Sequence, residues 1–73
     1  MALQTQSLNI TVNGSPLQIP EETTISGLLQ QLELDPQLVA VEQNLEIVTK
    51  SEYATRKVLG GDSIEIVHFV GGG

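Results

Sequence analysis

The dipeptide Asn13-Gly14 separates two short runs in which apolar and polar residues alternate. The first run covers residues 8–12, and the alternation resumes at residues 17–19. Asn-Gly between two such runs is the strongest short signal for a β-hairpin, because a type I′ turn needs positive φ at both central residues. We therefore expect the fold to begin with two antiparallel strands.

One amphipathic helix is expected after the hairpin. Its apolar residues lie at positions i, i+3, i+4 and i+7 of a single face: Ile25, Leu28, Leu29 and Leu32. Thr23 or Thr24 can cap its start, and Asp35-Pro36 is expected to end it, because proline disfavours helical geometry in the residue before it. A helical crossover requires the next strand to run parallel to one of the first two strands.

The remainder of the chain contains shorter elements. It is interpreted as a strand at residues 39–42, a turn at 43–44, a short strand at 46–48 and a helical turn at 51–54. A second turn at 60–62 and a final strand at 63–69 follow. With the hairpin and the helix, this order predicts an α+β, β-grasp (ubiquitin-like) fold: a mixed four- or five-stranded sheet with one main helix.

The chain has 73 residues, which is enough for one small domain. We expect a polar leader at 1–6, a β-grasp domain at 7–70 and a flexible glycine tail at 71–73. Tyr53 and Phe69 are the only aromatic residues, so the predicted core is aliphatic.

Composition excludes several functions. Nine acidic residues oppose Lys50, Arg56 and Lys57, and the net charge of −6 would repel nucleic-acid phosphates. We interpret the three cations as a solvated loop patch. The chain lacks cysteine, a secretory signal and a stretch of apolar residues long enough to cross a membrane, so we expect a cytoplasmic protein with no nucleic-acid or membrane partner.

No residue pattern indicates catalysis. The single histidine, His68, lies within the last predicted strand, where a packed or edge residue is the simpler reading. Glu42, Glu46 and Glu65 alternate along strands and are expected to face solvent, without the spacing of a metal site. We therefore predict no catalytic residue, no metal site and no cofactor bound by this chain, which is expected not to be an enzyme.

The sequence closes with Gly71-Gly72-Gly73 directly after the last predicted strand. Three extended residues span about 10 Å, and glycine, which has no Cβ, can enter a narrow channel. The carboxylate of Gly73 would become an acyl donor if a partner enzyme transferred AMP to it from ATP, and a persulfide could then displace the AMP. A frayed, inert end is the alternative reading of such a tail.

The strand before the tail suggests a docking surface. If Ile64 and Ile66 face the helix, then Val67 and Phe69 face the other side of the sheet. Exposed there, they would form a small apolar contact patch for a partner, together with Val70, Gly71 and Gly72. Packing of Phe69 over the sheet edge is the alternative.

Three segments carry a family resemblance: Thr24-Ile25-Ser26-Gly27-Leu28-Leu29, residues 39–48, and the ending Gly60-Gly61-Asp62-Ser63-Ile64-Glu65-Ile66-Val67-His68-Phe69-Val70-Gly71-Gly72-Gly73. Over residues 7–73 the chain resembles the ThiS family, the sulfur carriers of thiamine biosynthesis. It departs from that family's pattern at Asn44-Leu45, where the family usually has Asn-Gly, and in its longer N-terminal leader.

The resemblance implies a cycle. An adenylating enzyme related to ubiquitin-activating proteins would use Mg-ATP to activate Gly73, and a cysteine desulfurase would supply the sulfur of a thiocarboxylate. Thiazole synthase would consume that sulfur to form the thiazole of thiamine. The alternatives are a small subunit of molybdopterin synthase, a ubiquitin-like protein modifier and an inert β-grasp interaction module.

Overall fold

The structure is a computed structural model that describes residues 6–69. The strands are β1 (Ser7–Val12), β2 (Ser15–Pro20), β3 (Val39–Gln43), β4 (Glu46–Val48) and β5 (Ser63–His68). One α-helix, α1 (Ile25–Gln31), and two 3₁₀-helices, η1 (Pro36–Leu38) and η2 (Lys50–Glu52), complete the described part. None of these helices is long and apolar enough to cross a membrane.

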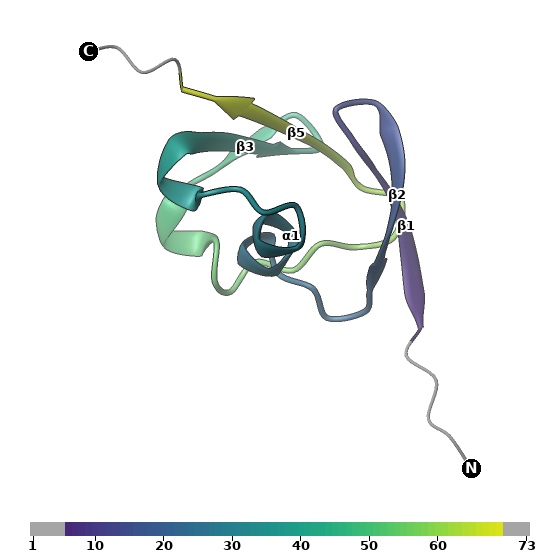
Figure 1. The fold of residues 1–73 in the computed structure, drawn as a ribbon. Coiled ribbons are helices and arrows are strands. Elements are labelled where there is room, and N and C mark those ends of the chain that lie inside the picture. The colour runs from purple at the N-terminus through teal and green to yellow at the C-terminus, as the bar shows by residue number, and fades with distance from the viewer. Residues whose placement is uncertain (1–5, 70–73) are drawn as a thin grey trace.

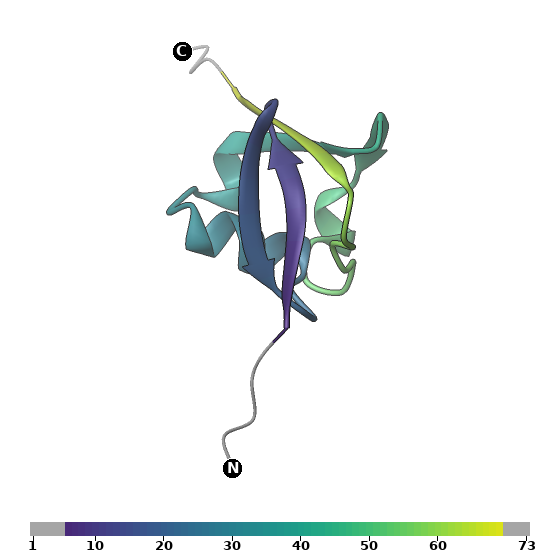
Figure 2. The ribbon, with the colours of Figure 1, turned by 90° about the vertical axis from the view of Figure 1, so that its right-hand side faces the viewer.

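The five strands form one mixed sheet in the order β2-β1-β5-β3-β4. Neighbouring strands are antiparallel except for β1 and β5, which are parallel. The sheet curves around α1, so that in Figure 1 β3 and β5 lie above the helix and the β1–β2 hairpin lies to its right; Figure 2 shows the hairpin face-on. The predicted mixed sheet of four or five strands with one main helix is confirmed, and it has five strands. β3 runs parallel to β2, as the crossover requires. The two strands are not neighbours, however, because β3 lies between β5 and β4.

The core lies between the sheet and α1. It is aliphatic except for Tyr53, as the composition predicts, and its buried members are Ile10, Ile19, Ile25, Leu28, Leu29, Val39, Val41, Val48, Tyr53, Val58, Ile64 and Ile66. Alternate residues of β3 and β5 contribute to it, which leaves the other face of these strands open.

Helix α1 starts where the sequence predicts and ends earlier. Thr24 is the N-cap, and its Oγ1 accepts a hydrogen bond from the Gly27 N–H at 3.1 Å. The expectation that Asp35-Pro36 ends the helix is wrong, because Glu33 already has a φ of +60°. This left-handed residue returns Leu34 to the core. Asp35 instead caps η1, accepting from the Gln37 N–H at 2.9 Å.

The turn between β3 and β4 is shifted by one residue from its predicted position. Gln43 still pairs within β3, and Asn44 and Leu45 form the turn with φ values of +52° and +71°. Positive φ at both central residues is the type I′ requirement that Asn-Gly normally meets. Leu45 adopts this conformation although its side chain is 86% exposed and gains no packing there.

Candidate functional site

The predicted reactive carboxylate belongs to the segment that follows β5, so β5 is the base of the candidate site. This strand is the centre of the sheet, between β1 and β3. It pairs with β3 over five residue pairs, from Val39↔His68 to Gln43↔Ile64. With β1 it pairs only at Thr11↔Ser63 and Val12↔Ile64. Further support on the β1 side has to come from elsewhere.

That support comes from the side chain of Asn13 in the β1–β2 turn. Its Oδ1 accepts from the Ile66 N–H at 2.7 Å, and its Nδ2 donates to the Ile66 carbonyl at 3.1 Å. A carboxamide carries one acceptor and one donor group, so Asn13 extends the β1–β5 ladder as a further strand residue would. The turn residue thus holds β5 near its middle.

Asn44, in the β3–β4 turn, holds the start of β5 in a similar way. Its Oδ1 accepts from the Ser63 N–H at 2.9 Å, and its backbone N–H donates to the Ser63 carbonyl at 2.8 Å. Its Nδ2 donates to Asp62 Oδ1 at 2.9 Å. Both asparagines of the two turns therefore grip the strand that leads to the C-terminal segment.

Asp62, immediately before β5, is buried among donors. Gln43 Nε2 and the Leu59 N–H both donate to its Oδ2, at 2.6 and 2.8 Å. Burial by itself raises the pKa of Asp62, but the hydrogen bonds from Asn44, Leu59 and Gln43 and the charge of Arg56 outweigh it and hold the pKa below its ordinary value. The carboxylate is therefore stable in its ionised form at neutral pH.

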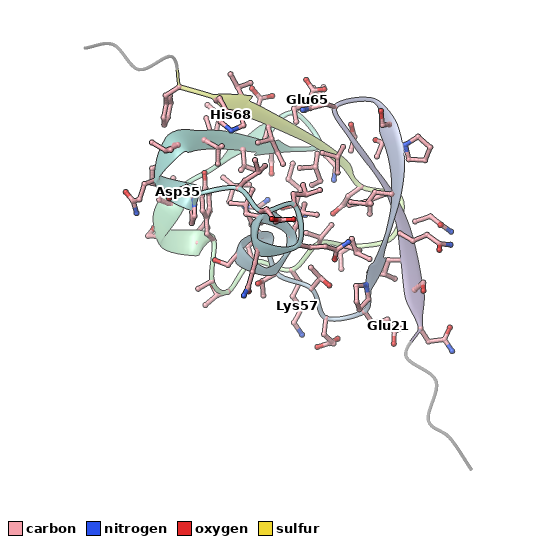
Figure 3. All side chains as sticks on the ribbon, viewed as in Figure 1. Glu21, Asp35, Lys57, Glu65 and His68 are labelled. Atoms are coloured by element: carbon pink, nitrogen blue, oxygen red, sulfur yellow. The ribbon has the colours of Figure 1, made fainter. Side chains whose placement is uncertain are left out.

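The two apolar residues predicted to contact a partner are both exposed. Val67 is 61% exposed and lies opposite Ala40 on the face of β5 that points away from the core. Glu65 lies on the same face and points away from α1 (Figure 3). Phe69 is 54% exposed and continues the pairing with β3, because its N–H donates to the Leu38 carbonyl at 2.9 Å.

The ring of Phe69 forms a cation–π contact with Lys50 and does not pack beside Val67. The Lys50 ammonium lies 5.1 Å from the centroid of the Phe69 ring and 5.7 Å from that of Tyr53. It also donates to the carbonyls of Pro36 and Val39, at 2.9 and 3.1 Å. Since Tyr53 belongs to the core, Phe69 is directed to the side of the sheet that carries the 3₁₀-helices.

The three cations differ from their predicted role as a solvated loop patch. They remain at the surface, but each has partners. Arg56 Nε donates to Gln43 Oε1 at 2.6 Å and its guanidinium approaches Glu46 and Glu52, while Lys57 pairs with Glu22. Their roles within the described residues are thus structural contacts to strands, helices and loops.

The remaining predicted site residues are Val70, Gly71, Gly72 and Gly73, and all four lie outside the described residues. His68 is exposed near the end of β5, opposite Val39 (Figure 3). Within residues 6–69, no group of three or more acidic, histidine or cysteine side chains is placed to hold a metal ion.

Sequence reasoning missed the three side chains that hold the base of the tail: Asn13, Asn44 and Lys50. The two asparagines were recognised only as turn residues, although a turn needs just the backbone geometry that glycine also supplies. The presence of asparagine rather than glycine at both positions was the available signal. Lys50 gave none, because its contacts join segments that are distant in sequence.

Comparison with known proteins identifies the family. The ThiS family profile matches residues 5–73. The sulfur carrier protein ThiS of Bacillus subtilis is 42% identical over 65 residues, which cover 88% of this chain and 98% of that protein. A thiazole synthase of Paramagnetospirillum magneticum is 46% identical over 66 residues, or 90% of this chain. The chain spans only about a fifth of the length of the thiazole synthases it matches.

Solved structures agree with the sequence comparison. The crystal structure of the thiamine biosynthesis protein ThiS from Geobacter metallireducens matches with a TM-score of 0.79 and 33% identity, covering 90% of this chain and all of that one. Ubiquitin from Caldiarchaeum subterraneum, at 17% identity, matches with a TM-score of 0.53 over 96% of this chain and all of its own, which shows the ubiquitin-like fold. The predicted β-grasp fold is confirmed, and by sequence and structure alike the chain belongs to the ThiS family.

Proposed function

We propose that this protein is a sulfur carrier of thiamine biosynthesis, whose reactive group is the C-terminal carboxylate of Gly73. The observation that carries the proposal is the family match, which runs through the last domain strand to Gly73 itself. The relative that this chain covers nearly end to end is named a sulfur carrier protein. In this role the chain is a protein co-substrate and its partners are the enzymes.

The chemistry starts with activation of a group that is inert toward nucleophiles. A partner enzyme transfers AMP from Mg-ATP to the Gly73 carboxylate, which forms an acyl-adenylate and releases pyrophosphate. The outer sulfur of a cysteine desulfurase persulfide attacks the acyl carbon and expels AMP, which leaves an acyl disulfide to the desulfurase cysteine. A second thiolate then attacks the cysteine sulfur of this acyl disulfide, which forms a cysteine disulfide and releases the thiocarboxylate on Gly73.

Thiazole synthase is the proposed acceptor of this sulfur. Two proteins with that name contain a region 46% and 41% identical to this chain, over a fifth of their length. Fusion of a carrier-like region to the enzyme that consumes the sulfur would keep the two at high effective concentration. The fused relatives therefore support thiazole synthase as a partner of the separate carrier.

The open face of β5 supplies the proposed docking contact. Val67 is exposed there beside the chain that leads to Gly73. Leu59 is exposed to the same extent, 61%, but lies before the opposite end of β5, so it is a matched control. We expect Val67→Ser to raise the KM for adenylation and Leu59→Ser to leave it unchanged. Equal effects of the two substitutions would exclude a docking role for Val67.

Phe69→Ala is expected to weaken adenylation as well, and an unchanged reaction would exclude Phe69 from the contact.

Reconstitution tests the function itself. The chain would be incubated with the adenylating enzyme, a cysteine desulfurase, Mg-ATP and thiazole synthase, and thiazole formation would be measured. Deletion of Gly73 should abolish the reaction, and addition of one alanine after Gly73 should do so too, because it moves the carboxylate and adds a Cβ. Thiazole formation by either altered chain would contradict the proposal.

A further inference from the structure

Two segments that are distant from Lys50 in the sequence meet at its ammonium. η1 and the start of β3 supply the Pro36 and Val39 carbonyls, and the segment after β5 supplies the Phe69 ring. The buried ring of Tyr53 closes the group, and its hydroxyl donates to the Val39 carbonyl at 3.4 Å. Among residues 6–69 the ammonium therefore has four partners, and three of them belong to the domain ahead of the C-terminal segment.

Phe69 is the last residue before the segment that carries Gly73. Within the part of the chain that the structure describes, its backbone is held by one hydrogen bond, to the Leu38 carbonyl, beyond the end of β5. The residue is 54% exposed, so the core does not enclose it. The Lys50 contact is therefore a side-chain interaction that ties this residue to the domain.

From this geometry we infer that Lys50 is a positioning residue for the C-terminal segment. Its ammonium holds the Phe69 ring and so sets the direction in which the chain continues toward Gly73. A C-terminal segment whose starting direction is already set loses less conformational entropy when a partner binds the carrier. The contact therefore lowers the free-energy cost of placing the carboxylate in the partner's active site. The inference rests on the proposed function for its consequence, though not for the contact itself.

Lys57 offers a matched control. Lys50→Met and Lys57→Met each remove one positive charge, and both lysines are exposed. Lys57 pairs with Glu22 and lies on the opposite side of the molecule from the end of β5 (Figure 3). A general effect of charge on partner binding would therefore appear in both variants, and an effect on the tail only in Lys50→Met.

The first measurement is the steady-state rate of adenylation by the partner enzyme, well below the unfolding temperature of each variant. We expect Lys50→Met to raise the KM for the carrier roughly two- to fivefold over Lys57→Met, the range that an exposed cation–π contact supports, with kcat unchanged. Lys50→Arg should restore the KM, because arginine also donates to carbonyls and stacks on aromatic rings. Equal KM values for Lys50→Met and Lys57→Met, or a loss of kcat alone, would overturn the positioning role.

The second measurement needs no partner. Hydrogen exchange of the Phe69 amide should be faster in Lys50→Met than in the unaltered chain, with the Ile66 amide, held by Asn13, as an internal reference. Unchanged exchange at Phe69 would overturn the inference. If the unaltered chain is not adenylated at all, the proposed function fails, and the exchange experiment still decides whether Lys50 holds Phe69.

Discussion

The side chain of Asn13 forms two hydrogen bonds with the backbone of Ile66, although 53 residues separate them in the sequence. The β1–β2 turn therefore continues the short parallel pairing between β1 and β5. This relationship connects the first hairpin to the strand from which the proposed reactive end extends.

Asn13→Gly separates the two tasks of this residue. Glycine keeps the positive φ of the turn, which is +50° at Asn13, but it removes both bonds to Ile66. We expect the free energy of unfolding to fall by about 1–3 kcal/mol, the net value of two hydrogen bonds. Urea denaturation followed by circular dichroism measures it. A stability equal to that of the unaltered chain would show that Asn13 acts only as a turn residue.

Leu45→Gly is expected to stabilise the domain, in contrast to Asn13→Gly, because no described packing depends on Leu45. Its φ of +71° is unfavourable for leucine, and its side chain is almost fully exposed. We expect glycine to stabilise the domain by about 0.5–1 kcal/mol, after the greater backbone entropy of glycine in the unfolded chain is subtracted. Thermal unfolding tests this, and a lower melting temperature would mean that Leu45 makes a stabilising contact.

The lowered pKa of Asp62 predicts that the domain loses stability as the pH falls. Because its folded pKa lies below the unfolded value, its contribution is complete above the unfolded pKa and is lost as the pH falls through the folded pKa. Asp62→Asn should destabilise the domain at neutral pH, since its amide would face donors of Gln43 and Asn44, and should flatten the acid decline. An unchanged acid profile in this variant would show that other carboxylates control it.

The burial of Tyr53 predicts that the folded domain loses stability at alkaline pH. Burial raises the pKa of its phenol above the ordinary value, since the core disfavours the charged form. A raised folded pKa gives stability that is complete below the unfolded pKa and is lost as the pH rises through the folded one. Absorbance titration follows this single tyrosine directly. Titration of the folded protein at or below the ordinary tyrosine pKa would contradict the burial.

The sequence predicted the elements whose signals are local. Alternation and the Asn13-Gly14 turn located the hairpin, and the apolar stripe and Thr24 located the start of α1. The early end of the helix, before the left-handed Glu33, was missed because no glycine marks it, and Leu34 then packs against the core.

The contacts around the candidate site were less predictable. The exposure of Val67 follows from strand alternation. Phe69 is exposed as well, but its contact with Lys50 directs it to the other side of the sheet from Val67, which alternation did not predict. The Lys50–Phe69 contact depends on bringing η2 beside the end of β5, which only the complete fold determines. Partner contacts of these residues and the chemistry of Gly73 remain predictions.

The central claim is that the carboxyl group of Gly73 carries sulfur. Intact-mass analysis of the chain purified from its own cells, under conditions that preserve thiocarboxylates, tests this most directly. We predict a population heavier by the replacement of one oxygen with sulfur, located by fragmentation on Gly73 and absent when Gly73 is deleted. A chain that shows only the unmodified mass, even when thiamine synthesis is active and thiazole synthase is removed to block sulfur consumption, would contradict the account.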